Sequence, residues 1–169
     1  MARYHSQCKI EAQIEVLTMV MTGLDVFDKT TQQTQLWVNE VARELGWDDH
    51  HKTFQVLRAT LHVLRDRLTL GEAANLGAEL PILLAGFYYE GWKPERTPTK
   101  ERTKAAFLES LQNHFRHYFQ NNEFDVDIEQ AARAVFKVIS DRVPTGEVED
   151  VTGILPAELK ELFPEAVRA

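Results

Sequence analysis

Cysteine is almost missing from the 169-residue sequence, because Cys8 is the only one. A single cysteine cannot form a disulfide within the chain and cannot supply a cysteine cluster for a metal ion. The fold must therefore be held together by packing, hydrogen bonds and ion pairs. At this length we expect one domain, or two small halves that share a core.

Basic residues are outnumbered, since 19 Lys and Arg residues face 26 Asp and Glu residues and the formal net charge is −7. Non-specific binding to nucleic acid or to an anionic membrane surface requires the opposite balance of charge. The composition therefore predicts a protein with no nucleic-acid partner.

Long apolar runs are also missing, and none approaches the roughly 20 residues that a membrane-spanning helix needs. Residues Met1–Gln13 are polar and lack the apolar central region of a signal peptide. No segment shows the alternation of apolar and polar residues that is typical of strands. We therefore predict an all-α cytoplasmic protein with no integral membrane association.

Recognisable catalytic and phosphate-binding motifs are also absent. The sequence has no glycine-rich phosphate loop, nucleophile elbow or paired-carboxylate motif. The histidine pairs His50-His51 and His114-x-x-His117 are predicted to lie on solvated faces rather than to bind a metal. We expect no enzymatic activity, no catalytic or metal-binding residue and no cofactor.

What the sequence does contain is a long internal repeat, in which residues 58–81 return without gaps as residues 133–156, 75 positions later. The identical pairs are Arg58/Arg133, Ala59/Ala134, Val63/Val138, Asp66/Asp141, Arg67/Arg142, Gly71/Gly146, Glu72/Glu147, Leu80/Leu155 and Pro81/Pro156. Such a period predicts a tandem duplication of one helical unit, with about four helices in each repeat.

A second spacing relates the helices that precede these segments. Trp37, Val41 and Leu45 line one face of a helix that ends at Gly46, and Phe107, Leu111 and Phe115 follow them by 70 residues. The change from 70 to 75 places five additional residues in the loop Gln120–Asp127 of the second repeat. The predicted organisation is an N-terminal helical extension (1–26), repeat 1 (27–92), a linker (93–102) and repeat 2 (103–169).

The extension is predicted to form an amphipathic helix, because Ile10, Ile14, Leu17 and Met21 fall on one helical face. In each repeat the second helix, about His50–Leu68 and Asp127–Val143, is apolar over most of its circumference and should form the centre of the core. Arg58, His62 and Arg65 are expected on its solvated edge. Thr69-x-x-Glu72 resembles a capping box that opens a third helix. In the second repeat Pro144 replaces Thr69, and Thr145 is the candidate cap.

The repeated Asp-Arg pairs are predicted to be structural, because a catalytic constellation rarely needs two copies in one chain. Arg67 should reach Glu72 or the carbonyl groups that close its own helix, and Arg142 should do the same with Glu147.

An aromatic run in the first repeat has no counterpart in the second. Phe87, Tyr88, Tyr89 and Trp92 precede the polar linker and form a candidate interaction surface. The alternative is that these side chains pack on the N-terminal helix, within one chain or exchanged between two chains. Because successive helical residues point about 100° apart, at least one should stay available to a partner.

The repeated Arg-Ala, Asp-Arg, Gly-Glu and Leu-Pro pairs also carry a resemblance. From Thr22 to Pro164 the sequence resembles a bacterial family of conserved proteins, domain of unknown function 2267. The resemblance implies a duplicated, all-helical, bacterial cytoplasmic protein. It implies no activity, cofactor or functional residue.

Two functions are compatible with these observations. The first is a protein-interaction module that self-associates, as a homodimer, or binds another protein. The alternative is a small-molecule or lipid binding protein with its pocket at the junction of the repeats. An enzyme is the least favoured interpretation.

Overall fold

The computed structural model describes residues 22–100, 102–118 and 126–168, and within them the chain is all-helical without a strand. The predicted fold class is therefore confirmed at the level of all-α. The helix predicted over residues 10–21 lies outside the described residues, as do residues 120–125 of the predicted loop.

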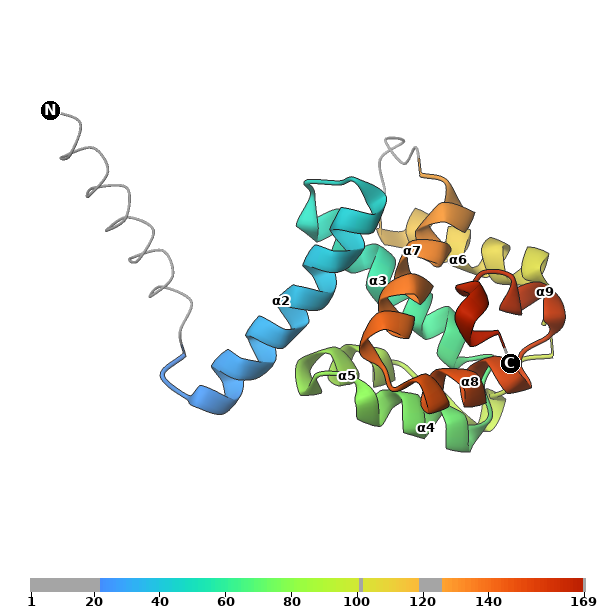
Figure 1. Ribbon diagram of the computed structural model, residues 1–169, viewed down its shortest axis with the longest axis horizontal. Helices are drawn as coiled ribbons and strands as arrows, with labels where there is room; N and C mark the ends of the chain where they lie inside the picture. The colour runs from blue at the N-terminus through green and yellow to red at the C-terminus, as the bar shows by residue number, and fades with distance from the viewer. Residues whose placement is uncertain (1–21, 101, 119–125, 169) are drawn as a thin grey trace, which may run out of the picture.

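Eight α-helices make up the described part of the chain, in two successive groups of four (Figure 1). The first group is α2 (Asp25–Leu45), α3 (His50–Arg65), α4 (Leu70–Glu79) and α5 (Ile82–Tyr89). After a short 3₁₀ helix (Pro94–Arg96) the second group is α6 (Lys104–Tyr118), α7 (Ile128–Arg142), α8 (Thr145–Ile154) and α9 (Ala157–Lys160), and a 3₁₀ helix (Glu165–Val167) follows.

The helix ends follow from local sequence chemistry. Gly46 closes α2 in the left-handed region at φ 67°, which a glycine adopts without strain. The hydroxyl of Thr69 accepts a hydrogen bond from the backbone N–H of Glu72, which confirms the predicted cap of α4. Pro144 occupies the corresponding position before α8 and offers no side-chain bond, and Thr145 is the first helical residue rather than the cap.

The core is centred on α3 and α7, as the sequence predicts. Val56, Leu57 and Leu61 of α3 are fully buried, and Val135 and Phe136 of α7 are at most 1% exposed. Burial of such side chains is the main favourable term in folding. A column of aromatic rings extends this core across the second group, from Phe107 through Phe136 to Phe163.

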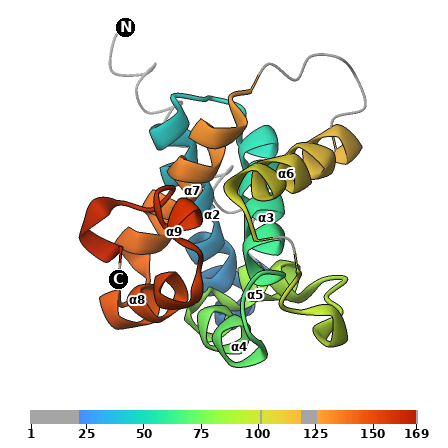
Figure 2. The same ribbon diagram turned by 90° about the vertical axis from the view of Figure 1, so that its right-hand side faces the viewer.

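The two groups of helices are interlocked rather than set side by side. α2 packs on α7 as well as on α3, and α6 packs on α3 as well as on α7. α4 and α8 also lie next to each other, so the third helices of the two groups are in contact (Figures 1 and 2). The first turns of α2 extend beyond the helices that cover the rest of it (Figure 1). Among the helices described, none is long and apolar enough to cross a bilayer.

Candidate interaction surface

The end of α5 is held against α3 by charged and polar side chains. The Nε2–H of His62 donates to the carbonyl oxygen of Phe87 at 2.5 Å, and Arg65 donates to the carbonyl oxygens of Tyr88 and Glu90. Carbonyl groups at a helix C-terminus lack helical partners and carry partial negative charge, so donors and cations there are favourable.

These contacts correct the expectation of a solvated edge on α3. His62 and Arg65 are only 6% and 4% exposed. The helical pattern of α3 alone makes this edge look polar and solvated, but α5 covers it and supplies the acceptors. Burial lowers the pKa of His62, and the positive charges of Arg65 and Arg58 lower it further. The bond to Phe87 acts in the opposite direction, but burial dominates.

The aromatic run that precedes the linker diverges in three directions. Tyr88 is completely buried, and its hydroxyl donates to the carbonyl oxygen of Ala73 at 2.9 Å. Burial raises the pKa of Tyr88 well above its ordinary value. Phe87 makes an edge contact with Phe54, at 5.0 Å between ring centroids. Tyr89 turns towards α4 and is 37% exposed.

Trp92 lies against Tyr89, with ring centroids 5.6 Å apart. The four aromatic residues therefore do not form one surface. The prediction is wrong for Tyr88, because its position on α5 points it into the core. The expected contact of this run with residues 10–21 lies outside the described residues.

A different property of α5 marks a surface. None of its eight residues, Ile82–Tyr89, is polar or charged apart from the tyrosine hydroxyls. Ile82 is nevertheless 73% exposed and Leu83 is 38% exposed. A helix that is apolar on all sides is normally buried on all sides. The structure therefore leaves part of α5 uncovered.

The uncovered part of α5 has two faces. Ile82, Gly86 and Tyr89 are spaced i, i+4, i+7, share one side of the helix and are all exposed; we call them the outer face. Leu83 and Phe87 are spaced i, i+4 on another side and line a groove.

The groove lies between α2, α3 and α5 and has a volume of about 310 Å³. Its lining comprises Thr31, Thr34, Gln35 and Val38 of α2, His50, His51 and Phe54 of α3, and Leu83 and Phe87 of α5. Thr34 is 7% exposed, and its hydroxyl has no hydrogen-bond partner. A buried hydroxyl without a partner is costly and is usually satisfied by a neighbouring group. We refer to this feature as the α2–α5 groove.

The repeated arginines connect the two groups of helices. Arg67 donates to the carbonyl oxygen of Val63 at 2.9 Å, which confirms the predicted bond to its own helix. Arg67 also donates to the carbonyl oxygen of Ala106 and to the hydroxyl of Ser110, both on α6. Arg67 is 3% exposed, and its hydrogen bonds join α3 to α6.

Arg142 behaves differently from the prediction. Its guanidinium makes two hydrogen bonds, 2.5 and 2.6 Å, with the carboxylate of Glu40 on α2, and not with Glu147. The packing of α7 on α2 brings Glu40 within reach, which no local pattern indicates. These hydrogen bonds hold the pKa of Glu40 below its ordinary value.

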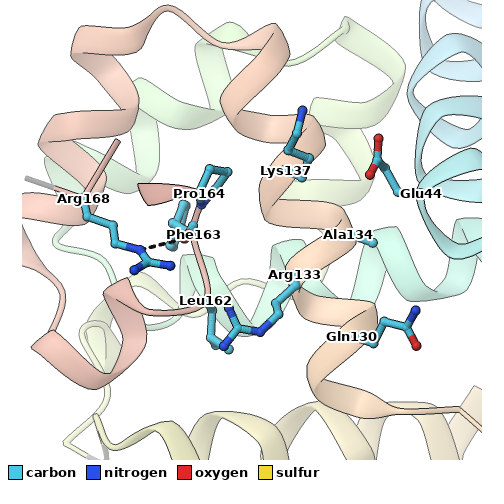
Figure 3. A pocket seen from close by; sticks show the side chains of 9 residues that line it. All are labelled: Glu44, Gln130, Arg133, Ala134, Lys137, Leu162, Phe163, Pro164 and Arg168. Atoms are coloured by element: carbon cyan, nitrogen blue, oxygen red, sulfur yellow. Dashed lines mark hydrogen bonds between the residues drawn. The ribbon is translucent and has the colours of Figure 1, made fainter. Parts of the chain in front are cut away.

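A second pocket, of about 350 Å³, lies between α7 and the C-terminal residues (Figure 3). Arg133, Lys137 and Arg168 line it, together with Glu44 of α2. Arg133 and Arg168 both donate to the carbonyl oxygen of Glu161. This pocket therefore combines three cations with an apolar floor formed by Leu162, Phe163 and Pro164.

The remaining candidates of the sequence are dispersed. His50 contacts the amide of Gln35, and the Nδ1 of His114 lies 2.9 Å from the carbonyl oxygen of Ser110. Over the described ranges, no group of three or more His, Cys, Asp or Glu side chains could hold a metal ion.

A family model described as an uncharacterized conserved protein (DUF2267) matches residues 34–162. The chain belongs to this family. A comparison with curated proteins finds no match. The matched range includes both arginine contacts, the outer face of α5 and most of the α2–α5 groove.

The side chains that the two repeated arginines contact could have been found in the sequence. Glu40 and Ser110 are separated by 70 residues, the spacing that relates α2 to α6. The run ILLAGFYY is apolar throughout, and such a run before a polar linker indicates either a core helix or a contact helix. Which side of it stays exposed could not be predicted, because the other helices decide what is covered.

Proposed function

We propose that this protein is an interaction module that self-associates through the outer face of α5. The observation that carries the proposal is the exposure of Ile82, at 73%, on a helix without a charged residue. Exposed apolar surface on a helix of this kind marks a contact with another macromolecule.

The partner that fits this face best is a second copy of the chain. Two copies with a net charge of −7 repel each other, and the residues of α5 itself add no charge to a contact between them. Gly86 lies between Ile82 and Tyr89, and a Cβ at this position would meet no atom within 4 Å. The glycine therefore allows the backbone of a second helix to approach closely across a two-fold axis.

Light scattering after size-exclusion chromatography tests this function. We expect the wild-type protein to have twice the mass of one chain and Ile82→Asp to have the mass of a single chain, because the aspartate would be buried without a partner. Leu70→Asp is the matched control, since Leu70 is 52% exposed on α4. It should remain dimeric. A monomeric wild-type protein, or equal effects of the two variants, would reject self-association through α5.

The absence of enzymatic activity and a cytoplasmic location belong to the same proposal. The repeated Arg67 and Arg142 are engaged in bonds between helices, which supports a structural role for both. The single cysteine is typical of a protein that does not depend on disulfides, as cytoplasmic proteins do not.

We also infer that the two groups of four helices arose by tandem duplication and are related by an approximate two-fold axis. Arg67 reaches Ser110 of α6, while Arg142, 75 positions later, reaches Glu40 of α2, 70 positions earlier than Ser110. Each arginine thus contacts the corresponding position of the opposite group. Superposition of α2–α5 on α6–α9 in a crystal structure tests the inference, and different helix directions in the two groups would reject it.

A second candidate function is binding of a small anion in the pocket lined by Arg133, Lys137 and Arg168 (Figure 3). Three cations beside an apolar floor favour a carboxylate or phosphate that carries a short apolar group, which would compete with Glu129 for Arg133 and with Asp141 for Lys137. Calorimetric titration with inorganic phosphate and with a short fatty acid tests this function. We expect saturable binding that Lys137→Gln weakens, and binding that is absent or unchanged in the variant would reject it.

A further inference from the structure

The α2 side of the α2–α5 groove has a regular pattern. Phe27, Thr31, Thr34 and Val38 are spaced i, i+4, i+7, i+11 and therefore form one stripe along α2. Phe27 is 53% exposed, Val38 is 6% exposed, and the last three of the four line the groove. Such a stripe beside an apolar groove fits a helix that lies lengthwise along α2.

We propose that residues 10–21 of the same chain fold back as a helix and pack in the α2–α5 groove. Ile10, Ile14, Leu17 and Met21 have the same spacing, i, i+4, i+7, i+11, as the stripe on α2. Both stripes span twelve residues, which corresponds to a helix of about 18 Å. The proposal concerns the groove and is independent of the outer face of α5.

The register of the two stripes supports a fold-back within one chain. Antiparallel packing pairs Met21 with Phe27, Leu17 with Thr31, Ile14 with Thr34 and Ile10 with Val38. The residue numbers of every pair add up to 48, which is the value that a reversal of the chain at residue 24 requires. A helix from an unrelated partner would have no reason to match this register.

The residues at the point of reversal have the required geometry. Gly23 has φ +75°, which favours glycine and lets the chain change direction. Both the backbone N–H and the hydroxyl of Thr22 donate to the carboxylate of Asp28, at 2.7 and 2.9 Å. Two antiparallel helices are commonly joined by two to five residues, and residues 22–24 provide three.

The other walls of the groove complete the fit. Phe54, Leu83 and Phe87 supply apolar surface opposite the stripe on α2, so the apolar face of residues 10–21 would be enclosed from three helices. The buried hydroxyl of Thr34 faces the groove without a partner. Gln13, next to Ile14 in the sequence, would bring a side-chain amide close to this hydroxyl.

A disulfide in the full-length chain tests the proposed register. Cys8→Ser removes the native thiol, and Ile14→Cys with Thr34→Cys places two thiols at a predicted contact. A disulfide needs Cα atoms within about 7 Å. Ile14→Cys with Leu36→Cys is the control, because residue 36 lies about 200° from residue 34 around α2. We expect a link within one chain that forms at least about ten times faster than in the control.

The position of the link decides the result. A link between two chains would show that a second copy supplies the helix and would overturn the proposal. Equal rates in the test and control variants would overturn it too, as would the absence of any link.

Hydrogen exchange of the full chain provides a measurement that does not depend on engineered thiols. We expect amides of residues 10–21 to exchange at least about ten times more slowly than in an unfolded chain. Leu83→Asp should abolish this protection, because Leu83 lines the groove. Ile82→Asp should leave the protection intact while it dissociates the dimer, so the groove and the outer face of α5 are tested separately. Unprotected amides in the wild-type protein, or equal loss in both variants, would overturn the proposal.

Discussion

The last helices of the two groups, α5 and α9, are contacted in different ways by α3 and α7, although the sequences of the two groups correspond. In the first group Arg58, His62 and Arg65 of α3 face the end of α5, and Arg65 and His62 bind its carbonyl groups. The residues 75 positions later are Arg133, Lys137 and Ser140. Of these, Arg133 binds the carbonyl of Glu161 near the end of α9, while Lys137 pairs with Asp141 on its own helix.

The difference follows from the length of the last helix. α5 has eight residues and covers the polar edge of α3, whereas α9 has four. The first edge is therefore buried, and the second lines a pocket of about 350 Å³. The comparison teaches that corresponding polar edges of two helices become core or surface according to what the following segment covers.

The same contrast between a buried and an exposed edge appears where α3 meets α6 and where α7 meets α2. His62 lies beside His114 of α6, with ring centroids 6.3 Å apart. The corresponding residues are Lys137 and Glu44. The hydrogen bond to Asp141 raises the pKa of Lys137, and the negative charge of Glu44 raises it further. The buried edge carries two imidazole rings at this position, and the exposed edge carries a lysine and a glutamate.

The largest effect is expected from the repeated arginines. Arg67→Ala should lower the free energy of unfolding by about 3 kcal/mol, because it removes charged donors from buried acceptors on α3 and α6. Arg142→Ala should cost about 1 kcal/mol, since its pair with Glu40 is partly exposed to solvent. Urea denaturation of both variants measures the difference. Equal losses would show that the two arginines are equivalent after all.

The next largest effect concerns Gly77, whose counterpart 75 residues later is the buried Thr152. A Cβ at Gly77 would lie 2.1 Å from the hydroxyl oxygen of Tyr89 and 3.0 Å from Cε1 of Tyr88. Gly77→Ala should therefore destabilise the protein by about 2 kcal/mol through overpacking.

Denaturation of Gly77→Ala in a Tyr89→Leu background isolates the cause of this loss. The cost of the alanine should fall by at least half, because the nearest obstructing atoms are gone. An unchanged cost would mean that Tyr89 is not the obstacle.

A smaller effect is expected at Tyr88, which corresponds to Phe163 in the second group. Tyr88→Phe makes the two ends alike and removes the hydrogen bond from the hydroxyl to the carbonyl of Ala73, so we expect a loss of about 1 kcal/mol. Tyr89→Phe is the control, because the bond of Tyr89 to Ala74 is longer and exposed. Thermal denaturation distinguishes the two, and a larger loss in the control would refute the comparison.

The smallest effect is a pH dependence due to His62. Its pKa is lowered in the folded protein, so the unfolded chain binds the proton more readily. The stabilising contribution of His62 is complete above the unfolded pKa of about 6.5 and is lost as the pH falls towards the folded pKa. His62→Gln should reduce this loss on acidification, and the exposed His51→Gln should not. Denaturation curves at pH 7 and pH 5 provide the measurement. The same change in the free energy of unfolding between these pH values in the wild type and both variants would contradict the prediction.

Much of the fold could be predicted from the sequence, because helix ends and apolar stripes depend on neighbouring residues. Gly46 at the end of α2, the cap at Thr69 and the core stripe of α3 are examples, since each rests on residues within a few turns of the chain. The 70- and 75-residue spacings are also properties of the sequence alone.

The partners of polar side chains were decided by tertiary structure. Arg142 pairs with Glu40, 102 residues away, and the buried position of His62 depends on α5, 25 residues further along the chain. A polar stripe on a helix has the same pattern whether it meets water or the end of another helix. Only the packing of α5 on α3 and of α7 on α2 determines which of these it meets, because only packing brings the acceptor groups into reach.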